Sequence, residues 1–283
     1  MILVADSGSS KTDWLLSAPG QENRAFKSAG LNPYFLTEKE IAKIIQEQVP
    51  DMVALGDGIT EIYFFGAGCS SPDRHEIVSN AISSLIPAAY VSVDSDLLAS
   101  AYATCGHEKG ICCVLGTGSN ISFFDGEDIH DGQHGLGYAL GDEGSGTWFG
   151  KALVTDYLYG NMPEDINAKF KKNHHLTKED VIINVYQKAR PNSYLASFSK
   201  FLSEIRGTDY AQSLLQRGFQ EFVDTNVKAS YPHYDKFKCH FVGSIAYVFA
   251  DELKAVCEQN GVHVGKIIRQ PIIDLLEFIL KRG

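Results

Sequence analysis

The chain has 283 residues, of which 44% are apolar and 21% are charged, and its formal net charge is −10. This length is enough to bury a large core and favours two domains, and the composition is that of an ordinary folded protein. Broad binding to nucleic acid or to an anionic membrane surface requires clustered Lys and Arg, so the acidic balance argues against both partners. No apolar run approaches the ~20 residues of a spanning helix, and no basic region opens the chain as in a signal peptide, so we expect a cytoplasmic protein.

The six cysteines lie at positions 69, 105, 112, 113, 239 and 257. They form no C-x-x-C pair, and no histidine pair stands near them at zinc spacing. Cys112 and Cys113 are neighbours in a strand-like run, so their side chains point to opposite faces and do not converge on one metal ion. We expect reduced, buried thiols that pack as small apolar side chains.

The first part of the chain alternates strand and helix patterns. Apolar runs predict strands at residues 2–6, 14–16, 62–65 and 90–93. Thr37 and Glu40 form a capping-box pattern before an apolar stripe, which predicts a helix over about 38–48. A second helix is expected from Ser71-Pro72 onward, with its apolar residues at helical spacing. The alternation indicates an α/β architecture in which helices pack on a mostly parallel sheet.

The second part restarts the same pattern. Strands are expected at 111–115 and 121–124, joined by a loop of small residues, and Asp125-Gly126 is typical of a hairpin turn. We interpret this as an internal repeat of the N-terminal strand, loop and strand. A helix is expected near Thr147, followed by a long helical region from about 163 to 230 with a capping box at Thr177, a strand ending at 241–242, a helix over 244–258 and a packing helix over 271–281.

Two loops of small residues follow apolar strands at equivalent places in the repeat. Their sequences are Asp6-Ser-Gly-Ser-Ser-Lys-Thr-Asp13 and Gly116-Thr-Gly-Ser-Asn120. Small side chains let backbone N–H groups approach a phosphate, although one such loop alone is also a common hairpin turn. Neither loop is a P-loop or a dinucleotide fingerprint. Lys11 is equally compatible with phosphate binding and with a solvated turn.

Carboxylates stand where strands end. Asp6 closes the first strand and could hold Mg²⁺ beside nucleotide phosphates, the alternative being a turn-forming Asp. Asp94 and Asp96 follow the strand at 90–93, and phosphoryl transfer to a sugar hydroxyl needs a carboxylate that takes the hydroxyl proton. Asp94 is expected to cap the following helix, which leaves Asp96 as the candidate base.

A glycine-rich stretch runs from Gly135 through Leu136, Gly137 and Asp142 to Thr147. Its backbone entropy cost suggests a place where a ligand or another backbone segment approaches closely. Asp142 or Glu143 could accept hydrogen bonds from sugar hydroxyls, and a capped helix start can exist at the same place. His134 has no evident partner and is expected to be a loop histidine.

Together these segments resemble the BadF/BadG-type ATPases and N-acetylglucosamine kinases of the actin, Hsp70 and hexokinase superfamily. The resemblance spans most of the chain and rests on the two loops, Asp96 with its helix, and Gly141-Asp-Glu-Gly-Ser-Gly-Thr-Trp-Phe-Gly-Lys151, with a weaker match at Phe241-Val-Gly-Ser244. It implies two ribonuclease-H-like domains of the actin-like ATPase type, with an interdomain cleft for ATP and sugar. Residues 1–105, joined by the C-terminal helix 271–283, would form one domain and residues 106–270 the other.

The resemblance also implies roles for individual residues. ATP, with Mg²⁺ at Asp6, would be bound by Asp6, Gly8, Ser9, Ser10, Lys11, Thr12, Gly116, Thr117, Gly118, Gly243 and Ser244. Asp96 would be the catalytic base. The amino sugar, most naturally N-acetylglucosamine converted to its 6-phosphate, would be bound by Asn32, Asp96, Ser119, Asn120, Gly135, Leu136, Gly137 and Asp142. A homodimer is expected on the same ground.

This chain departs from the family pattern at two places. The usual first loop is D-G-G-G-T-K-T, and here Ser7 and Ser9 replace glycines while Ser10 replaces threonine. Thr147 stands where an aromatic residue is common.

Two other functions fit the same superfamily. A dehydratase-activator ATPase would require cysteines placed to share an iron–sulfur cluster between subunits, and the cysteine contexts here do not match. A non-catalytic sugar sensor of the repressor type would join a DNA-binding module to the fold, and the first strand begins at the N-terminus with Asp96 retained, which makes this alternative the least favoured.

Overall fold

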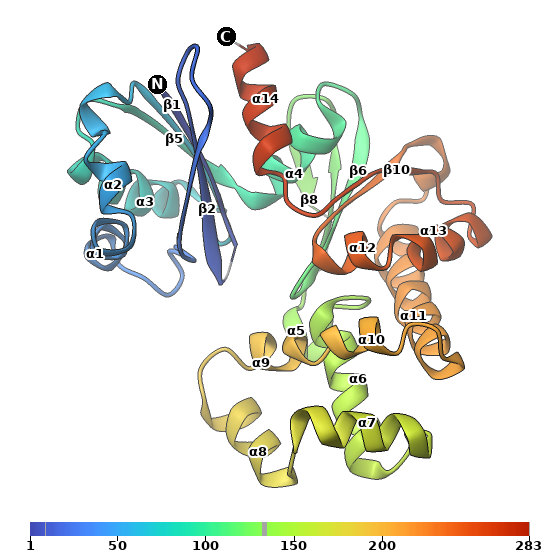
Figure 1. The fold of residues 1–283 in the computed structure, drawn as a ribbon. Helices are drawn as coiled ribbons and strands as arrows, with labels where there is room; N and C mark the ends of the chain where they lie inside the picture. The colour runs from blue at the N-terminus through green and yellow to red at the C-terminus, as the bar shows by residue number, and fades with distance from the viewer. Residues whose placement is uncertain (9, 132–134, 283) are drawn as a thin grey trace. The chain divides into compact units, whose positions relative to one another are not determined.

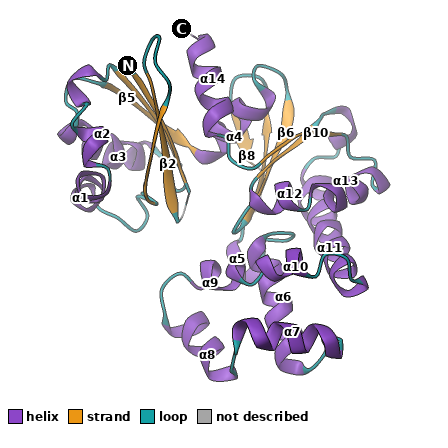
Figure 2. Ribbon diagram, viewed as in Figure 1, coloured by secondary structure: helices purple, strands orange, loops and turns teal. Residues whose placement is uncertain are grey.

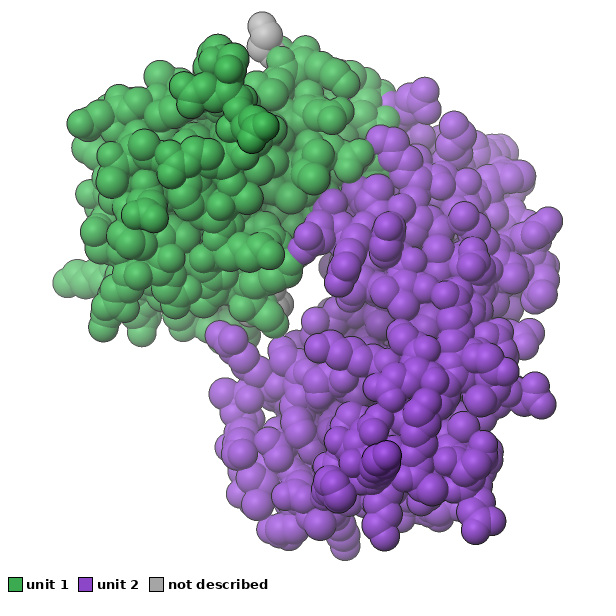
Figure 3. Space-filling view, in the orientation of Figure 1, with its two compact units in different colours: residues 1–107, 271–283 green, residues 108–270 purple. Residues whose placement is uncertain are grey.

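The computed structural model describes residues 1–8, 10–131 and 135–282 (Figure 1). Each of its two five-stranded sheets mixes parallel and antiparallel strands and is flanked by helices (Figure 2). The chain divides into two compact units, one made of residues 1–107 and 271–283 and the other of residues 108–270 (Figure 3). The predicted α/β fold class, with two ribonuclease-H-like sheets, is confirmed.

The sheet of the first unit has the order β3-β2-β1-β4-β5. Strand β2 is antiparallel to both β1 and β3, whereas β1, β4 and β5 are parallel. Strands β1, β3, β4 and β5 therefore all end at one edge of the sheet, which is where ligands bind in open α/β sheets. The strands are β1 (Ile2–Ser7), β2 (Lys11–Ser17), β3 (Arg24–Ala29), β4 (Glu61–Gly66) and β5 (Tyr90–Ser95).

Helices cover both faces of this sheet. Helices α1 (Glu38–Gln48) and α3 (Pro72–Leu85) pack on the face that carries Phe64, while α4 (Asp96–Cys105) lies on the face that carries Phe65. Helix α14 (Ile272–Arg282) packs against α4, where the ring of Phe278 stacks on Tyr102 at 4.4 Å. The short helix α2 (Pro50–Val53) and a 3₁₀ turn over 56–58 complete the unit. The capping box that predicted the start of α1 is present.

The second unit repeats the strand order of the first. Its sheet runs β10-β9-β6-β7-β8 with the same pattern of parallel and antiparallel pairs, which confirms the predicted internal repeat. The strands are β6 (Gly110–Leu115), β7 (Ser119–Phe124), β8 (Ile129–Asp131), β9 (Cys239–Val242) and β10 (Val264–Ile268). Sequence patterns missed β3, β8 and β10 because edge strands are short or carry exposed charged residues.

The helices of the second unit refine one expectation and correct another. The helical region predicted over about 163–230 consists of several helices, because His175 and Arg190 adopt left-handed backbone conformations and Pro191 begins a new helix. The expected helix over 244–258 is divided at Phe249, whose φ and ψ are −109° and 37°. The helices are α5 (Gly137–Leu140), α6 (Gly146–Tyr159), α7 (Glu164–His174), α8 (Lys178–Ile182), α9 (Pro191–Ser197), α10 (Lys200–Glu204), α11 (Asp209–Phe222), α12 (Ser244–Val248) and α13 (Ala250–Gln259); π-helical turns follow α8 and α11 at 183–187 and 223–228, and a 3₁₀ turn spans 234–236.

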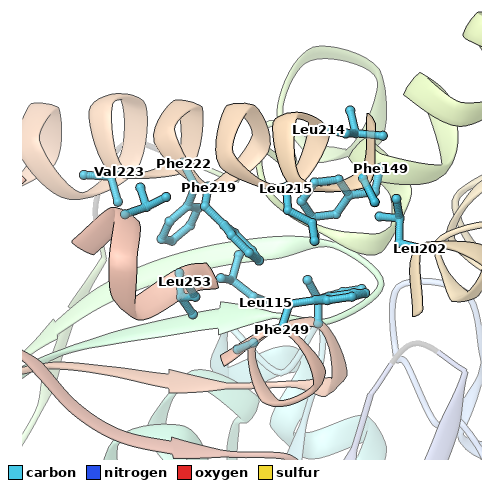
Figure 4. Packing of buried hydrophobic residues seen from close by; sticks show 14 of the residues in the cluster. Leu115, Phe149, Leu202, Leu214, Leu215, Phe219, Phe222, Val223, Phe249 and Leu253 are labelled. Atoms are coloured by element: carbon cyan, nitrogen blue, oxygen red, sulfur yellow. The ribbon is translucent and has the colours of Figure 1, made fainter. Parts of the chain in front are cut away.

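The hydrophobic core of the second unit holds the end of β6 in place. Leu215, Phe219 and Phe222 of α11 point toward the sheet, where Leu115 closes β6 (Figure 4). Each of these side chains is fully buried. Burying an aromatic or leucine side chain contributes about 1.5–3 kcal/mol, so this packing fixes the point from which the second small-residue loop starts.

All six cysteines are free and buried, as predicted. Cys113 belongs to the core beneath α11, and its neighbour Cys112 points to the other face of the sheet. No helix in the described ranges is long and apolar enough to cross a membrane.

Candidate active site

The first unit gathers its candidate site residues at the edge where four strands end. Asp6 on β1 lies opposite Phe65 on β4, which in turn lies opposite Asp94 on β5. Asp96 begins α4 immediately after β5. One expectation is corrected here: Ser95, and not Asp94, caps α4, since the Ser95 hydroxyl accepts a hydrogen bond from the Leu98 N–H at 3.3 Å.

The carboxyl group of Asp6 is in an environment that disfavours its charge. Burial, then the negative charges of Asp96 and Asp13, raise the pKa of Asp6 to about 7, although Lys11 acts in the opposite direction. Two carboxylates held together in this way are typical of sites where ligand or metal supplies the missing positive charge. The residues predicted as metal ligand and base are therefore neighbours in the folded unit.

Ser7, which replaces a family glycine, connects the first loop to its surroundings. Its buried hydroxyl is 2.8 Å from the Thr12 hydroxyl and accepts a hydrogen bond from the Leu31 N–H at 3.0 Å. Thr12 also donates to the carbonyl of Ala29. Thr12 is fully buried, so its side chain supports the loop from beneath. The sequence did not predict these hydrogen bonds, because serine is also common in solvated turns.

The turn itself is built from small residues and one lysine. A Cβ at Gly8 would meet only the carbonyl oxygen of Lys11, at 3.8 Å, and Ser10 is exposed. Ser9 lies outside the described residues. The ammonium group of Lys11 forms an ion pair with Asp13 at 2.5 Å, and Lys27 is 3.9 Å from the same carboxylate. Lys11 is therefore a half-exposed lysine that is paired with Asp13, and not a solvated lysine without a partner.

Asn32 is held against the end of β4. Its side-chain oxygen accepts a hydrogen bond from the Tyr34 N–H at 2.9 Å. A Cβ at Gly68 would lie 2.3 Å from that oxygen, so only glycine permits this contact. Asn32 therefore lies at the same edge as Asp6 and Asp96, which is where a sugar-binding residue is needed.

In the second unit the loop after β6 is braced by Asp142. Its carboxylate accepts a hydrogen bond from the Ser119 N–H at 3.1 Å and lies where a Cβ at Gly118 would clash, at 2.9 Å. Asp142 itself adopts a positive φ of 61°, a strained conformation that is common at functional sites. Burial raises its pKa, while the bond from Ser119 acts against this rise.

Thr147, which stands where an aromatic residue is common in the family, makes hydrogen bonds that an aromatic side chain could not make. Its hydroxyl donates to the carbonyl of Thr117 at 2.6 Å and to that of Asn192 at 3.1 Å. The N–H of Thr147 also bonds to Thr117, at 2.9 Å. Helix α6 is capped by Ser145, as the expected helix start required, and the same helix start fixes the loop containing Thr117.

The turn after β9 lies beside the same loop. Gly243 has a φ of 133°, and a Cβ there would come within 2.2 Å of the Leu115 carbonyl oxygen. Ser244 follows as the exposed first residue of α12. The structure therefore brings together Gly116–Gly118 and Gly243–Ser244, two segments that are far apart in the sequence.

The remaining candidates for sugar binding lie in the second unit, and only some of them are in contact with one another. Asn120 accepts a hydrogen bond from the Ile121 N–H, and its side chain is about 3.5 Å from where a Cβ of Gly135 would be. The Ser119 hydroxyl is buried and has no hydrogen-bond partner among the described residues. Leu136 is exposed and Gly137 opens the short helix α5. Glu143 is already paired with the side chain of Asn226 at 3.1 Å, and His134 lies outside the described residues.

A metal bound by protein groups alone is not supported, since no cluster of three or more His, Cys, Asp or Glu side chains suited to a metal occurs in the described part of the chain. A single carboxylate is sufficient for Mg²⁺, which keeps several waters and takes further oxygens from substrate phosphates. Asp6 fits that requirement, because its environment has an excess of negative charge.

Comparison with known proteins gives matches among solved structures only: no protein-family model and no curated protein matches the chain. A Porphyromonas gingivalis protein named, by inference, as an N-acetylglucosamine kinase is 36% identical, with a TM-score of 0.93 and 98% of both chains covered. A Chromobacterium violaceum protein named in the same way is 17% identical, with a TM-score of 0.72 and 98% coverage of both chains. A Streptomyces griseus ROK family glucokinase, solved with glucose and AMPPNP, is 15% identical, with a TM-score of 0.58, and covers 100% and 99% of the two chains. The first match is similar enough to show the family, and the other two show the fold.

Proposed function

Because the chain belongs to the family of BadF/BadG-type ATPases and N-acetylglucosamine kinases, in the actin, Hsp70 and hexokinase superfamily, we propose that it is an ATP-dependent sugar kinase acting on an N-acetylated amino sugar. N-acetylglucosamine, phosphorylated on O6, is the proposed substrate. The sugar-kinase assignment agrees with the names of the relatives. The observation that carries the proposal is the pairing of Asp6 and Asp96 at the edge of the first unit that also holds Asn32.

Asp96 is proposed to be the catalytic base. The sugar O6 attacks the γ-phosphorus, the bond between this phosphorus and the bridging oxygen breaks, and ADP leaves with the electron pair. The O6 proton passes to the Asp96 carboxylate, which orients the hydroxyl before transfer. Asn32 is proposed to fix the sugar, because its amide is held in one orientation by Tyr34.

The other predicted residues are proposed to position the nucleotide. Backbone groups of Gly8, Ser10, Gly116, Thr117 and Gly118 would donate to phosphate oxygens, and Gly243 with Ser244 would lie near the adenosine. Asp6, together with the phosphates, would hold Mg²⁺, which would neutralise the charge that develops on the transferred group. Ser119, Asn120 and Asp142 would complete the sugar contacts, and the unpartnered Ser119 hydroxyl is suited to this because a buried hydroxyl needs a partner.

The activator function fits less well. An iron–sulfur cluster shared by two subunits requires thiolates that reach the protein surface. All six thiols are buried, and burial raises the pKa of Cys257 to about 12 and, together with the charges of Asp96 and Asp94, that of Cys69 to about 12. Thiols buried inside one chain do not present sulfur ligands at the surface, where a cluster shared with a second subunit would lie.

The deciding experiment is Mg²⁺-dependent ADP release from ATP across a panel of N-acetylated amino sugars, glucosamine and neutral hexoses, with Asp96→Asn as control. Release that depends on an N-acetylated sugar and vanishes in the variant supports the proposal, and ³¹P NMR of the product identifies the phosphorylated oxygen. Release independent of sugar would indicate an ATPase such as the activator. Sugar binding without ADP release would indicate a sensor.

A further inference from the structure

A groove on the sheet of the first unit is not used by the kinase chemistry above. It has a volume of about 570 Å³ and is lined mainly by β4, β5, α4 and the last turn of α14. Its floor follows β4 from Glu61 through Tyr63 to Phe65, which pairs with Asp6 on β1. Strand residues rise about 3.3 Å each, so Glu61 lies roughly 13 Å from Phe65 along the strand. The groove therefore begins at the strand ends opposite to the candidate active site, and its size suits one small metabolite.

Arg282, in the last turn of α14, gives one wall of the groove a positive charge. Its guanidinium lies 5.1 Å from the centroid of the Tyr102 ring and 5.7 Å from that of the Phe278 ring, and it donates to the Tyr102 hydroxyl at 3.4 Å. Among the described residues no carboxylate forms an ion pair with Arg282, whereas the neighbouring Lys281 pairs with Glu277 at 3.7 Å. The two rings therefore orient the guanidinium, and most of its N–H groups remain available to an anion.

The floor of the groove is suited to hydroxyl groups. The carboxylate of Glu61 accepts a hydrogen bond from the Tyr63 hydroxyl at 2.7 Å, and this bond, together with burial, raises the pKa of Tyr63 to about 12. Glu61 forms no ion pair within the part of the chain that the structure describes, so its other lone pairs can accept from a ligand. Ser92 lies opposite Tyr63 on β5 and adds a hydroxyl to the lining. Aromatic surface with a few convergent polar groups is typical of a small-molecule site.

The charges of the lining restrict the class of ligand. Arg282 calls for an anionic group, which a neutral sugar does not offer. Glu61 and Asp94 also line the groove and together outnumber this one cation, so a bare anion is repelled by them. A ligand that satisfies both ends carries an anionic group at one end and several hydroxyl donors at the other.

We propose that this groove is a second binding site, separate from the active site, and that it takes a monosaccharide phosphate. The phosphate binds the guanidinium of Arg282, and the sugar hydroxyls bind Glu61 and Ser92. A monosaccharide phosphate is also the product class of the reaction. That identification rests on the proposed function, whereas the chemistry of the groove does not.

The test titrates the protein with N-acetylglucosamine 6-phosphate by calorimetry, with excess N-acetylglucosamine present to fill the proposed catalytic sugar site. We expect saturable binding, which Arg282→Gln should weaken by about 10- to 100-fold through loss of a charge-assisted hydrogen bond. Arg282→Lys should restore part of the affinity, and Ser92→Leu, which fills the floor, should abolish binding. The matched control is Lys281→Gln, because it removes the same charge from a neighbouring residue that does not line the groove, and it should bind like the wild type.

The outcomes separate the groove from the active site. No binding under these conditions, or equal affinity in the wild type and Arg282→Gln, would overturn the proposal while leaving the kinase assignment in place. Inorganic phosphate that binds as tightly as the sugar phosphate would also overturn it, because the groove would then recognise an anion alone. Failure of the proposed function would appear as the absence of sugar-dependent ADP release, which this titration does not measure. Thermal unfolding of each variant identifies a loss caused by misfolding, and if Arg282→Gln misfolds, Arg282→Lys and Ser92→Leu provide the second test.

Discussion

Asp6 and Asp96 lie close together although 89 residues separate them and they belong to different elements. The burial of Asp6, followed by the charge of Asp96, raises the pKa of the Asp6 carboxyl to about 7. In the folded protein Asp6 keeps its proton up to about pH 7, whereas an exposed Asp releases it near 3.8. Between these values the folded state binds more protons than the unfolded state, so stability falls as pH rises through this window.

The first prediction follows from this loss of stability as pH rises. Asp6→Asn should raise the melting temperature of the protein without Mg²⁺ and nucleotide by about 2–6 °C at pH 8 and leave it nearly unchanged at pH 4.5. Calorimetry at the two pH values measures the difference. Equal shifts at both values would contradict the raised pKa.

The second prediction concerns the proposed base. Asp96→Asn should reduce turnover by about 10²-fold or more while nucleotide affinity changes little, because loss of a positioned base affects only the transfer step. The matched control is Asp94→Asn, near the end of the preceding strand β5, and it should reduce turnover by less than about tenfold. Steady-state kinetics and nucleotide titration measure the two quantities. Unchanged turnover in Asp96→Asn would remove this residue from the mechanism.

The third prediction tests the close approach of two backbone segments in the second unit. Gly243→Ala should destabilise the protein by about 3 kcal/mol or more and weaken nucleotide binding, since the new Cβ meets the Leu115 carbonyl oxygen at 2.2 Å. Gly160→Ala is the control, because Gly160 also has a positive φ, of 73°, but has no atom near that position. It should cost only about 1 kcal/mol in urea unfolding. Similar costs for both would show that the close approach is not required.

The fourth prediction concerns the hydroxyl of Thr147. Thr147→Val keeps the shape of the side chain but leaves the carbonyls of Thr117 and Asn192 without this donor. We expect a loss of about 1–3 kcal/mol in stability and a raised KM for ATP, because the Thr117 loop loses its support. Thr155→Val, on the exposed side of the same helix, should change neither. A normal KM in Thr147→Val would argue against a phosphate role for that loop.

The fifth prediction is a pH effect remote from the candidate site. Burial lowers the pKa of His174, whose ring packs on Phe170, Phe198 and Phe201. The unfolded chain therefore takes up this proton first as pH falls below 6.5, and stability is lost in that range. His174→Phe should reduce the difference in melting temperature between pH 7 and pH 5. An unchanged difference would show that His174 does not contribute to acid sensitivity.

Sequence patterns were sufficient for the elements with strong local signals. The capping boxes at Thr37 and Thr177, the Asp125-Gly126 turn and the proline-started helix α3 are all present, because each depends only on residues close to one another in the chain. The repeated strand, loop and strand were recognisable for the same reason. Strands β3, β8 and β10 and the breaks at His175, Arg190 and Phe249 were not, since their conformations are set by packing on distant segments.

The sequence by itself determined the fold class, the internal repeat and the kinds of residues that end each strand. Only the tertiary structure decided which of these residues are neighbours. The parallel strands bring Asp6, Asn32 and Asp96 to one edge, and the crossover to β9 places Gly243 against Leu115. The roles of Ser7 and Thr147 depend on hydrogen bonds to segments 24 and 30 residues away, and no local pattern encodes such long-range contacts.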